Sequence, residues 1–310
     1  MSTWRILLIF PHLAEHLIVI FSINSLANPG FSWPSVLSMA LASKLSYEEK
    51  EVVESTALDD WGYLYALFLD IKNTECFLAE TNSHVLLSFR GTQGIGDWVG
   101  NINLFPIHNP NYGTVHNGFF DAFYDVEKLL IEHLPKDKPM WITGHSLGGA
   151  LAAIASVEWR SKFEIYGICT FGQPRTGHQD FSETIRSSYP DSFFRFVNNR
   201  DLITRIPPGF QHAGSLYHFD ANGDIQEISA GFLPISPDPE PLTLDEFHQF
   251  QENINNIRNK IEMKPTENFA GHFDLLDDIL SRQYKSLSDH KIDRYIKNIS
   301  GQILASPDYT

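Results

Sequence analysis

The sequence predicts an α/β fold in which helices cover both faces of a mostly parallel central sheet. Short apolar runs that are typical of buried strands alternate with helix-like segments along the 310 residues. A second observation lies in residues 140–159, where an apolar run, a glycine-rich junction and an Ala/Leu-rich segment follow one another. This order predicts a buried strand that turns directly into a helix.

The junction Gly144-x-Ser146-x-Gly148 predicts a catalytic serine. Its pattern is that of the strand-to-helix elbow that lifts a serine hydroxyl out of an α/β-hydrolase sheet. The turn is so tight that side chains at 144 and 148 would collide with the neighbouring strand and helix. A serine just before a helix also faces backbone N–H groups that lack partners within the helix. We therefore expect an α/β-hydrolase fold with Ser146 as the nucleophile.

The composition restricts the classes of partner. With 23 basic and 38 acidic residues the formal net charge is −15, so nucleic acid would be repelled, whereas an uncharged ester or lipid would not. Cys76 and Cys169 are too few for a disulfide framework and do not follow the pattern of a zinc site. We expect both to be buried thiols.

Residues 1–30 are expected to form an extension, and residues 31–310 a single domain, because Asn28-Pro29-Gly30 breaks the chain. No apolar run in the extension reaches the ~18 residues that a transmembrane helix needs. Residues 17–23 could form the apolar region of a signal or anchor segment, with a cleavage site ending at Ala27. The preceding stretch is long and carries a glutamate, which favours a cytoplasmic protein over a secreted one.

The segments before the elbow are predicted from their apolar spacing. A helix that begins near Trp33 repeats apolar residues at helical spacing. Strands are expected at 63–71, 75–79 and 84–89, and the last of these is expected to be central. A second helix runs from about residue 115 towards Leu134.

The loop after the third strand, Phe89-Arg90-Gly91-Thr92, is a candidate for part of an oxyanion hole. In α/β-hydrolases one donor is the backbone N–H that follows the nucleophile, here Leu147, and the other comes from the loop after an earlier strand. Thr92 is the natural candidate, because its hydroxyl group could add a further hydrogen bond. An ordinary glycine-rich turn would explain the same residues equally well.

The triad acid is expected after the second strand that follows the elbow. Strands are predicted at 165–171 and 193–197, with a helix at 180–188 between them. The second strand ends in Asn198-Asn199-Arg200-Asp201. A carboxylate at the C-terminal end of a strand after the nucleophile strand agrees with the chain order Ser, Asp, His of this fold. Asp201 is therefore predicted to be the acid.

The C-terminal third is predicted to contain a hairpin and additional helices. Residues 216–219 and 225–228 flank an Asn222-Gly223 turn, which is typical of a hairpin. Thr243 and Glu246 have the spacing of a capping box and begin an amphipathic helix over 243–261.

This amphipathic helix is expected to belong to a helical insertion over about 237–287. Beyond the insertion, Ser288 or Asp289 is predicted to cap a last helix that ends at Gly301.

Six motifs along the chain, taken together and in their order, resemble the class 3 lipase family, the α/β-hydrolases related to fungal triacylglycerol lipases. They cover about residues 36–300, and their combination is far more specific than the elbow alone. The motifs are Phe89-Arg90-Gly91-Thr92, Asp97-Trp98, Val115-His116-Asn117-Gly118-Phe119, Thr143-Gly144-His145-Ser146-Leu147-Gly148-Gly149-Ala150, Phe171-Gly172-Gln173-Pro174-Arg175 and Val197-Asn198-Asn199-Arg200-Asp201.

The resemblance implies Ser146 as nucleophile, Asp201 as acid, and Thr92 and Leu147 at the oxyanion hole. It also implies that residues 93–103 form a short lid. The lid would bend at its glycines, and it would either bury or offer to lipid the apolar side chains of Ile95, Trp98 and Val99.

The base is expected to be His290, with His272 as the alternative, because the triad histidine follows Asp201. His290 is predicted to lie at the start of a helix, where the helix dipole would keep the imidazole neutral, and residues 289–296 resemble the histidine segment of bacterial class 3 lipases. His272 leads into the apolar pattern of a packed helix. His116, which precedes the serine beside aromatic residues, and His145, inside the elbow, are expected to be structural.

These residues together predict a carboxylic ester hydrolase that works through an acyl-enzyme and needs neither a metal ion nor an organic cofactor. The favoured substrate is an acylglycerol ester at a lipid–water interface. An esterase for soluble or cell-wall (feruloyl-type) esters would use the same chemistry. A catalytically silent hydrolase fold that serves as a binding module is the third possibility, because fold alone does not imply activity.

Overall fold

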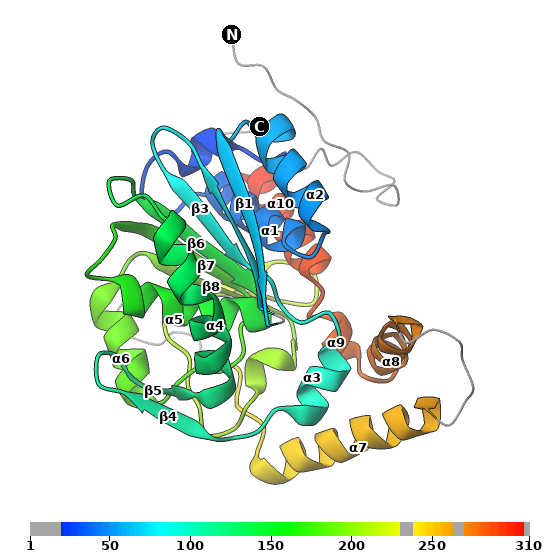
Figure 1. Cartoon of the computed structure of the whole chain (residues 1–310). Coiled ribbons are helices and arrows are strands. Elements are labelled where there is room, and N and C mark those ends of the chain that lie inside the picture. The colour runs from blue at the N-terminus through cyan, green and yellow to red at the C-terminus, as the bar shows by residue number, and fades with distance from the viewer. Residues whose placement is uncertain (1–19, 73, 230–237, 263–269, 307–310) are drawn as a thin grey trace.

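An eight-stranded sheet crosses the middle of the molecule in the order β1-β2-β3-β6-β7-β8-β9-β10 (Figure 1). The structure is a computed structural model that describes residues 20–72, 74–229, 238–262 and 270–306. The strands of the sheet are β1 (Tyr65–Ile71), β2 (Thr74–Glu80), β3 (Val85–Phe89), β6 (Met140–His145), β7 (Ile165–Phe171), β8 (Phe193–Asn198), β9 (Ser215–Phe219) and β10 (Ile225–Ser229).

The sheet is mostly parallel, as the sequence predicts. Neighbouring strands from β3 through β6, β7 and β8 to β9 pair in parallel, whereas β1–β2, β2–β3 and β9–β10 pair in antiparallel fashion. Because successive side chains of a strand point to opposite faces, Met140 and Ile142 pack on one face and Trp141 on the other. Burial on both faces explains why the central strands are nearly continuous apolar runs.

Helices cover both faces of the sheet, which confirms the predicted α/β-hydrolase architecture (Figure 1). On one face lie α4 (Asn117–His133), α5 (Leu147–Trp159) and α6 (Gln179–Ser188), and on the other lie α1 (Trp33–Leu45) and α10 (Ile292–Ala305). The remaining elements are shorter or peripheral. They are the helices η1 (Ile23–Leu26), α2 (Lys50–Ser55), η2 (Thr56–Asp60), α3 (Ile95–Asn101), η3 (Ile203–Arg205), α7 (Leu244–Glu262), α8 (Ala270–Gln283) and α9 (Lys285–Ser288), and the two-stranded pair β4 (Pro106–Asn109) and β5 (Gly113–His116).

The C-terminal ends of the parallel strands bring the predicted site residues to one edge of the sheet. Thr92 follows β3, Ser146 follows β6, and Asp201 lies in the loop after β8. Strand β7 lies between β6 and β8 and ends at Phe171, so the segment that begins at Gly172 separates the nucleophile from the acid.

Ordered packing begins earlier than the predicted boundary at residue 30. Leu26 is completely buried, and its carbonyl oxygen accepts a hydrogen bond of 2.9 Å from Nε1 of Trp141 in β6. Phe21 stacks on Trp61 with a centroid distance of 3.8 Å. Asn28-Pro29-Gly30 is therefore a surface turn between η1 and α1, and residues 20–27 pack with the domain; the rest of the predicted extension, residues 1–19, lies outside the described chain.

The predicted bounds of the last helix are wrong. Helix α10 begins at Ile292, and its N-cap residue is Lys291, which makes no side-chain capping hydrogen bond. The carboxylate of Asp289 accepts a hydrogen bond of 2.9 Å from Asn199 instead of capping the helix. At the other end, Gly301 lies inside the helix, which continues to Ala305.

The segment that was predicted as an insertion, 237–287, contains α7, α8 and part of α9, and α7 and α8 lie outside the main layers beside α3 (Figure 1). The predicted capping box at the start of α7 is present, because Thr243 Oγ1 accepts from the Glu246 N–H and the Glu246 carboxylate accepts from the Thr243 N–H, at 3.2 and 2.8 Å. Over the described chain, none of the helices has the length and apolar character needed to cross a bilayer.

Substitution of Leu26 by Ala should lower the free energy of unfolding by about 2–5 kcal/mol, because it removes buried methyl groups beneath Trp141. Chemical denaturation monitored by tryptophan fluorescence measures this change. Leu304→Ala is the matched control, since Leu304 is 56% exposed, and its effect should stay within about 0.5 kcal/mol. Equal effects of the two substitutions would contradict the packing of residues 20–27 described above.

Candidate active site

The turn between β6 and α5 holds Ser146 in a conformation that few residues adopt. Its backbone has φ 58° and ψ −130°, and it is one of the few non-glycine residues with positive φ in the described chain. A Cβ atom at Gly144 would lie 2.2 Å from the carbonyl carbon of Gly148, and a Cβ atom at Gly148 would lie 2.1 Å from the oxygen of Phe89. Both glycines are therefore required for the turn to form.

Asp201 and His290 form a buried hydrogen-bonded pair. Nδ1 of His290 lies 2.8 Å from Oδ2 of Asp201, and the two side chains are 3% and 0% exposed. The other oxygen of Asp201, Oδ1, accepts the backbone N–H of Ile203 at 2.9 Å. Gly172, with φ 59°, makes room for the pair, because a Cβ atom there would lie 2.8 Å from both Oδ2 of Asp201 and Nδ1 of His290.

The two atoms that would carry out the chemistry have no hydrogen-bond partner within the described residues. They are Oγ of Ser146 and Nε2 of His290, and both are buried. Hydrogen bonds between a nucleophile and its base are often long or poorly aligned before a substrate binds. A buried polar atom without a partner is uncommon in proteins, and a catalytic role is one of its explanations.

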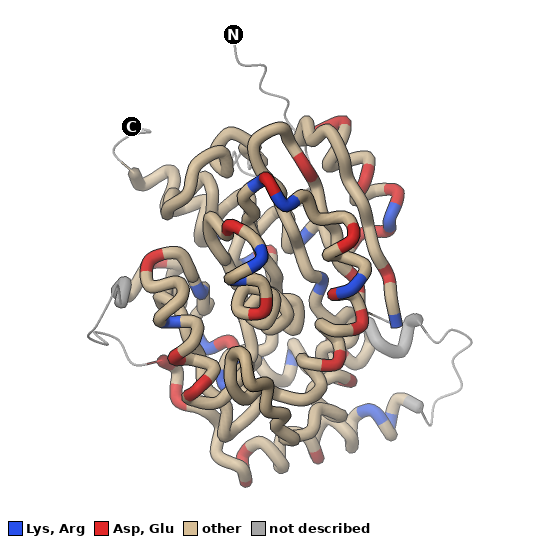
Figure 2. Tube along the Cα trace, turned by 60° about the vertical axis from the view of Figure 1, so that its left-hand side comes forward, with Lys and Arg blue, Asp and Glu red and all other residues tan. Residues whose placement is uncertain are grey.

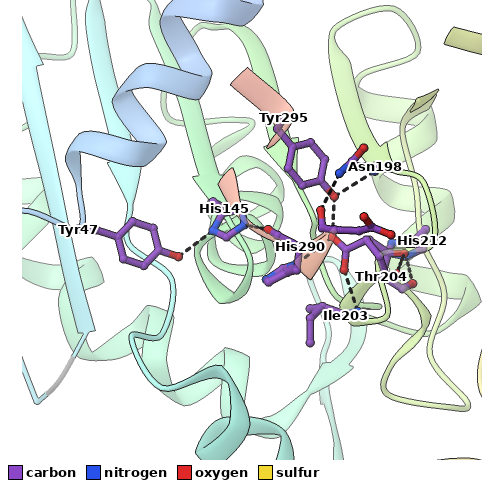
Figure 3. A network of polar contacts seen from close by, with 10 residues as sticks. Tyr47, His145, Asn198, Ile203, Thr204, His212, His290 and Tyr295 are labelled. Carbon is purple, nitrogen blue, oxygen red and sulfur yellow. Dashed lines mark hydrogen bonds and ion pairs between the residues drawn. The ribbon is translucent and has the colours of Figure 1, made fainter. Parts of the chain in front are cut away.

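Tyr295 is a functional neighbour that the sequence analysis missed. Its hydroxyl group donates a hydrogen bond of 2.5 Å to Oδ2 of Asp201 and accepts one of 3.1 Å from the backbone N–H of Asn198 (Figure 3). Burial, together with the neighbouring Asp201 carboxylate, raises the pKa of Tyr295 well above its usual value, so the hydroxyl group remains a donor. The sequence analysis placed Tyr295 only within the segment 289–296.

The loop that carries His290 is tied to the end of β8. Nδ2 of Asn198 donates to the carbonyl oxygen of Asp289 at 2.8 Å, and Nδ2 of Asn199 donates to its carboxylate at 2.9 Å. His290 thus lies in the link between α9 and α10, two residues before the first residue of α10, and not in the first turn of a helix as predicted. The hydrogen bonds of Asn198 and Asn199 therefore hold Asp289, the residue before the base, in place.

His272, the alternative base, falls within α8, but its side chain lies outside the described part of the structure. The buried pairing of His290 with Asp201 supports His290 as the base. The choice between the two histidines stays a prediction that activity measurements must decide.

The predicted oxyanion loop lies directly against Ser146. A Cβ atom at Gly91 would come within 3.0 Å of Cβ of Ser146, so the backbone of the loop passes close to the serine. Thr92 lines two cavities, of about 270 and 1130 Å³, that adjoin the site. Leu147, the second predicted donor, lines the larger one.

The two cavities differ in their lining. Part of the larger cavity is lined by apolar side chains of α3, α4 and α5 and by that of Ile102, just after α3. The helical ones include Trp98, Phe119, Leu147 and Leu151. The smaller cavity lies beside the base and is lined by His290 and Lys291 together with side chains of α8, such as Leu280 and Ser281.

The predicted lid segment contains helix α3, and both ends of this helix bind to α7 and α8. The carboxylate of Asp277 accepts the N–H groups of Ile95 and Gly96 at 3.0 and 2.8 Å. At the other end, Nε2 of Gln251 donates to the carbonyl oxygens of Val99 and Ile102 at 3.0 and 2.9 Å. Partners for both ends help a seven-residue helix to form, since an isolated helix of this length is unstable in water.

Two glycines of this segment have a role other than the predicted bending. A Cβ atom at Gly96 would lie 2.5 Å from Cδ1 of Leu280, and one at Gly100 would lie 3.1 Å from Oδ1 of Asn255. They allow close packing of α3 against α8 and α7. Of the predicted lid side chains, Val99 is buried, and Ile95 and Trp98 are partly buried.

Other expectations concern residues away from the reacting atoms. His116 is structural, as expected: its Nε2 lies 2.7 Å from the carbonyl oxygen of Asn103, and its Nδ1 accepts the N–H of Gly118. Cys76 and Cys169 are both free and buried, in agreement with the sequence analysis.

Comparison with known proteins agrees with this geometry. Residues 86–211 match the family model described as "Lipase (class 3)". The chain is 32% identical over 170 residues to a lipase from Rhizomucor miehei, an alignment that covers 49% of this chain and 47% of the relative. It is 26% identical over 274 residues to a triacylglycerol lipase from Arabidopsis thaliana, with 66% of this chain and 52% of the relative covered. The chain therefore spans about half the length of these curated relatives.

Solved structures show the same fold. A triacylglyceride lipase from Rhizomucor miehei has a TM-score of 0.51 at 24% identity, covering 62% of this chain and 80% of that one. A mutant MDLA from Penicillium cyclopium has a TM-score of 0.55 at 20% identity, covering 73% of this chain and 94% of that one.

Replacement of His290 by Ala should lower turnover by about 10⁴-fold or more, because the general base is lost. His272→Ala should retain most of the activity. Ester hydrolysis of the two variants, measured alongside their thermal unfolding, tests the assignment, and the reverse pattern in two folded variants would overturn it.

Proposed function

We propose that the chain, whose residues 86–211 match the class 3 lipase model, is a member of this family that hydrolyses carboxylic esters, with acylglycerols as the main substrates, through an acyl-enzyme on Ser146. The observation that carries the proposal is the buried hydrogen bond of 2.8 Å between His290 and Asp201, at the edge of the sheet where Ser146 follows β6. The unpartnered atoms Oγ of Ser146 and Nε2 of His290 support it, because they are the atoms that exchange a proton in this mechanism.

In the first half-reaction, Nε2 of His290 accepts the hydroxyl proton while Oγ of Ser146 attacks the ester carbonyl carbon. The carbonyl oxygen becomes an oxyanion, and the backbone N–H groups of Thr92 and Leu147 stabilise it. Removal of one such donor typically lowers turnover by about 10²–10³-fold. Collapse of the tetrahedral intermediate breaks the bond to the alcohol oxygen, which takes the proton from His290 and leaves an acyl group on Ser146.

In the second half-reaction, His290 accepts a proton from water as the water oxygen attacks the acyl carbon. The bond to Oγ breaks, Oγ takes the proton from His290, and the free acid leaves. Asp201 holds the imidazole in the tautomer that has Nδ1 protonated and stabilises its charged form. Ile203 and Tyr295 also donate to its carboxylate, so three donors fix the position of this group.

The two cavities suggest where the parts of an ester bind. The apolar side chains of the 1130 Å³ cavity suit an acyl chain. The alcohol must leave near the base that protonates it, and His290 lines the 270 Å³ cavity. The acidic balance of the chain, with acidic residues spread over many helices and loops (Figure 2), favours an uncharged substrate.

Access to the serine requires a movement, because Ser146 has no exposed surface. We assign this movement to the lid, residues 93–103, which includes α3 and lines the larger cavity through Trp98. Its displacement would break the contacts of Asp277 and Gln251 with α3 and would offer Ile95, Trp98 and Val99 to a lipid surface.

Hydrolysis of p-nitrophenyl esters over a range of chain lengths, with Ser146→Ala as the blank, tests this function. We expect activity that rises with chain length and jumps when the substrate passes from monomer to emulsion, and Trp98→Ala should reduce the jump.

Activity confined to short or aromatic esters would favour the esterase alternative, and no activity at any length would favour the binding module. A smooth saturation curve that Trp98→Ala leaves unchanged would exclude the lid as an interfacial switch.

A further inference from the structure

A hydrogen-bonded chain that the mechanism does not use reaches the backbone of His290. The hydroxyl oxygen of Tyr47 lies 2.8 Å from Nδ1 of His145, and Nε2 of His145 lies 2.7 Å from the carbonyl oxygen of His290 (Figure 3). A carbonyl oxygen only accepts, so Nε2 of His145 carries the proton. Nδ1 is then the acceptor, and the hydroxyl group of Tyr47 donates to it.

Tyr47 and His145 are both held in their neutral forms. Burial and the adjacent His290 hold the pKa of His145 well below 6.5. Burial raises the pKa of Tyr47 above its usual value, against the opposing effects of Arg90 and the backbone N–H of Gly91. The ring of His145 lies 4.5 Å from that of His290, centroid to centroid. A neutral His145 avoids like-charge repulsion with the imidazolium that forms on His290 in each catalytic cycle.

Tyr47 also contacts the predicted oxyanion loop. A Cβ atom at Gly91 would lie 2.1 Å from the hydroxyl oxygen of Tyr47, so the phenol packs directly against the backbone that precedes Thr92. Tyr47 comes from the segment just after α1, whereas His145 belongs to β6. The hydrogen bonds of Tyr47 and His145 therefore connect the oxyanion loop, the elbow at Ser146 and the loop that carries His290.

The backbone of His290 needs such an anchor, because it lies in the link between α9 and α10 and not within a helix. Its own N–H donates to Leu287 at 3.2 Å, and its carbonyl oxygen is bound by His145. A misplacement of a reacting group by about 1 Å can lower turnover about 10²-fold. Control of the main chain of His290 thus controls where its Nε2 lies relative to Ser146.

We propose that Tyr47 and His145 are positioning residues that fix the base His290 through its backbone carbonyl and keep it at a fixed position relative to the oxyanion loop. The inference rests on the proposed function of Ser146 and His290. Neither side chain exchanges a proton with the substrate.

Three substitutions test the inference: Tyr47→Phe, which removes only the hydroxyl group, His145→Leu, which removes the donor and the acceptor, and His145→Gln, which keeps an amide donor. On p-nitrophenyl butyrate we expect kcat to fall about tenfold in Tyr47→Phe and about hundredfold in His145→Leu, with KM changed by less than about twofold. His145→Gln should recover about tenfold of the loss. Because Tyr47 acts through His145, the double variant Tyr47→Phe/His145→Leu should be no slower than His145→Leu alone.

The control is His84→Leu, because His84 is also buried but lies at the opposite end of the sheet, just before β3. It should lower the thermal unfolding temperature without changing kcat.

An unchanged kcat in Tyr47→Phe and His145→Gln would overturn the inference, as would a change in KM alone, which would place these residues in substrate binding. If His145→Leu does not fold, Tyr47→Phe and His145→Gln decide the question. If the wild-type protein hydrolyses no ester and Ser146 is not labelled by a fluorophosphonate probe, the proposed function itself is refuted.

Discussion

The site depends on one steric constraint, the turn that takes the chain from β6 into α5 at Ser146. The serine has a positive φ, which costs about 1–3 kcal/mol in a non-glycine residue, and the turn closes only because Gly144 and Gly148 have no side chains. Parallel pairing of β6 with β3 and β7 then places the oxyanion loop and Gly172 on either side of the serine. The position of Ser146 at the edge of the sheet follows from this turn.

A second constraint is the burial of a carboxylate beside the sheet edge. Asp201 is buried, and a buried charge is tolerated only when it is paired and hydrogen-bonded. Its two oxygens accept from His290, Ile203 and Tyr295. His290 and Tyr295 come from the C-terminal region, so the packing of α10 and the position of the Asp201 carboxylate depend on each other. In this way, residues that do not contact the substrate determine the geometry of residues that do.

The sequence predicted the parts of the site that have a local cause. The elbow glycines and the carboxylate at the end of β8 follow from steric rules and chain order, which are visible in a few consecutive residues. Tyr295, Tyr47 and Asp277 have no such sign, because their partners are 94, 98 and 181–182 residues away in sequence. The cap of the last helix was predicted wrongly for the same reason, since Asp289 binds Asn199 instead. From the sequence, Gly96 and Gly100 indicated bending. In the structure they allow α3 to pack closely against α8 and α7.

The central claim is that Ser146 is a nucleophile activated by the Asp201–His290 pair. The most direct test is labelling with a fluorophosphonate probe, followed by mass spectrometry of the modified peptide, because an activated serine attacks phosphorus as it attacks an ester carbonyl. We expect one adduct, on Ser146, that is absent in Ser146→Ala and forms far more slowly in His290→Ala. Labelling that persists in Ser146→Ala, or an adduct on another residue, would contradict the account.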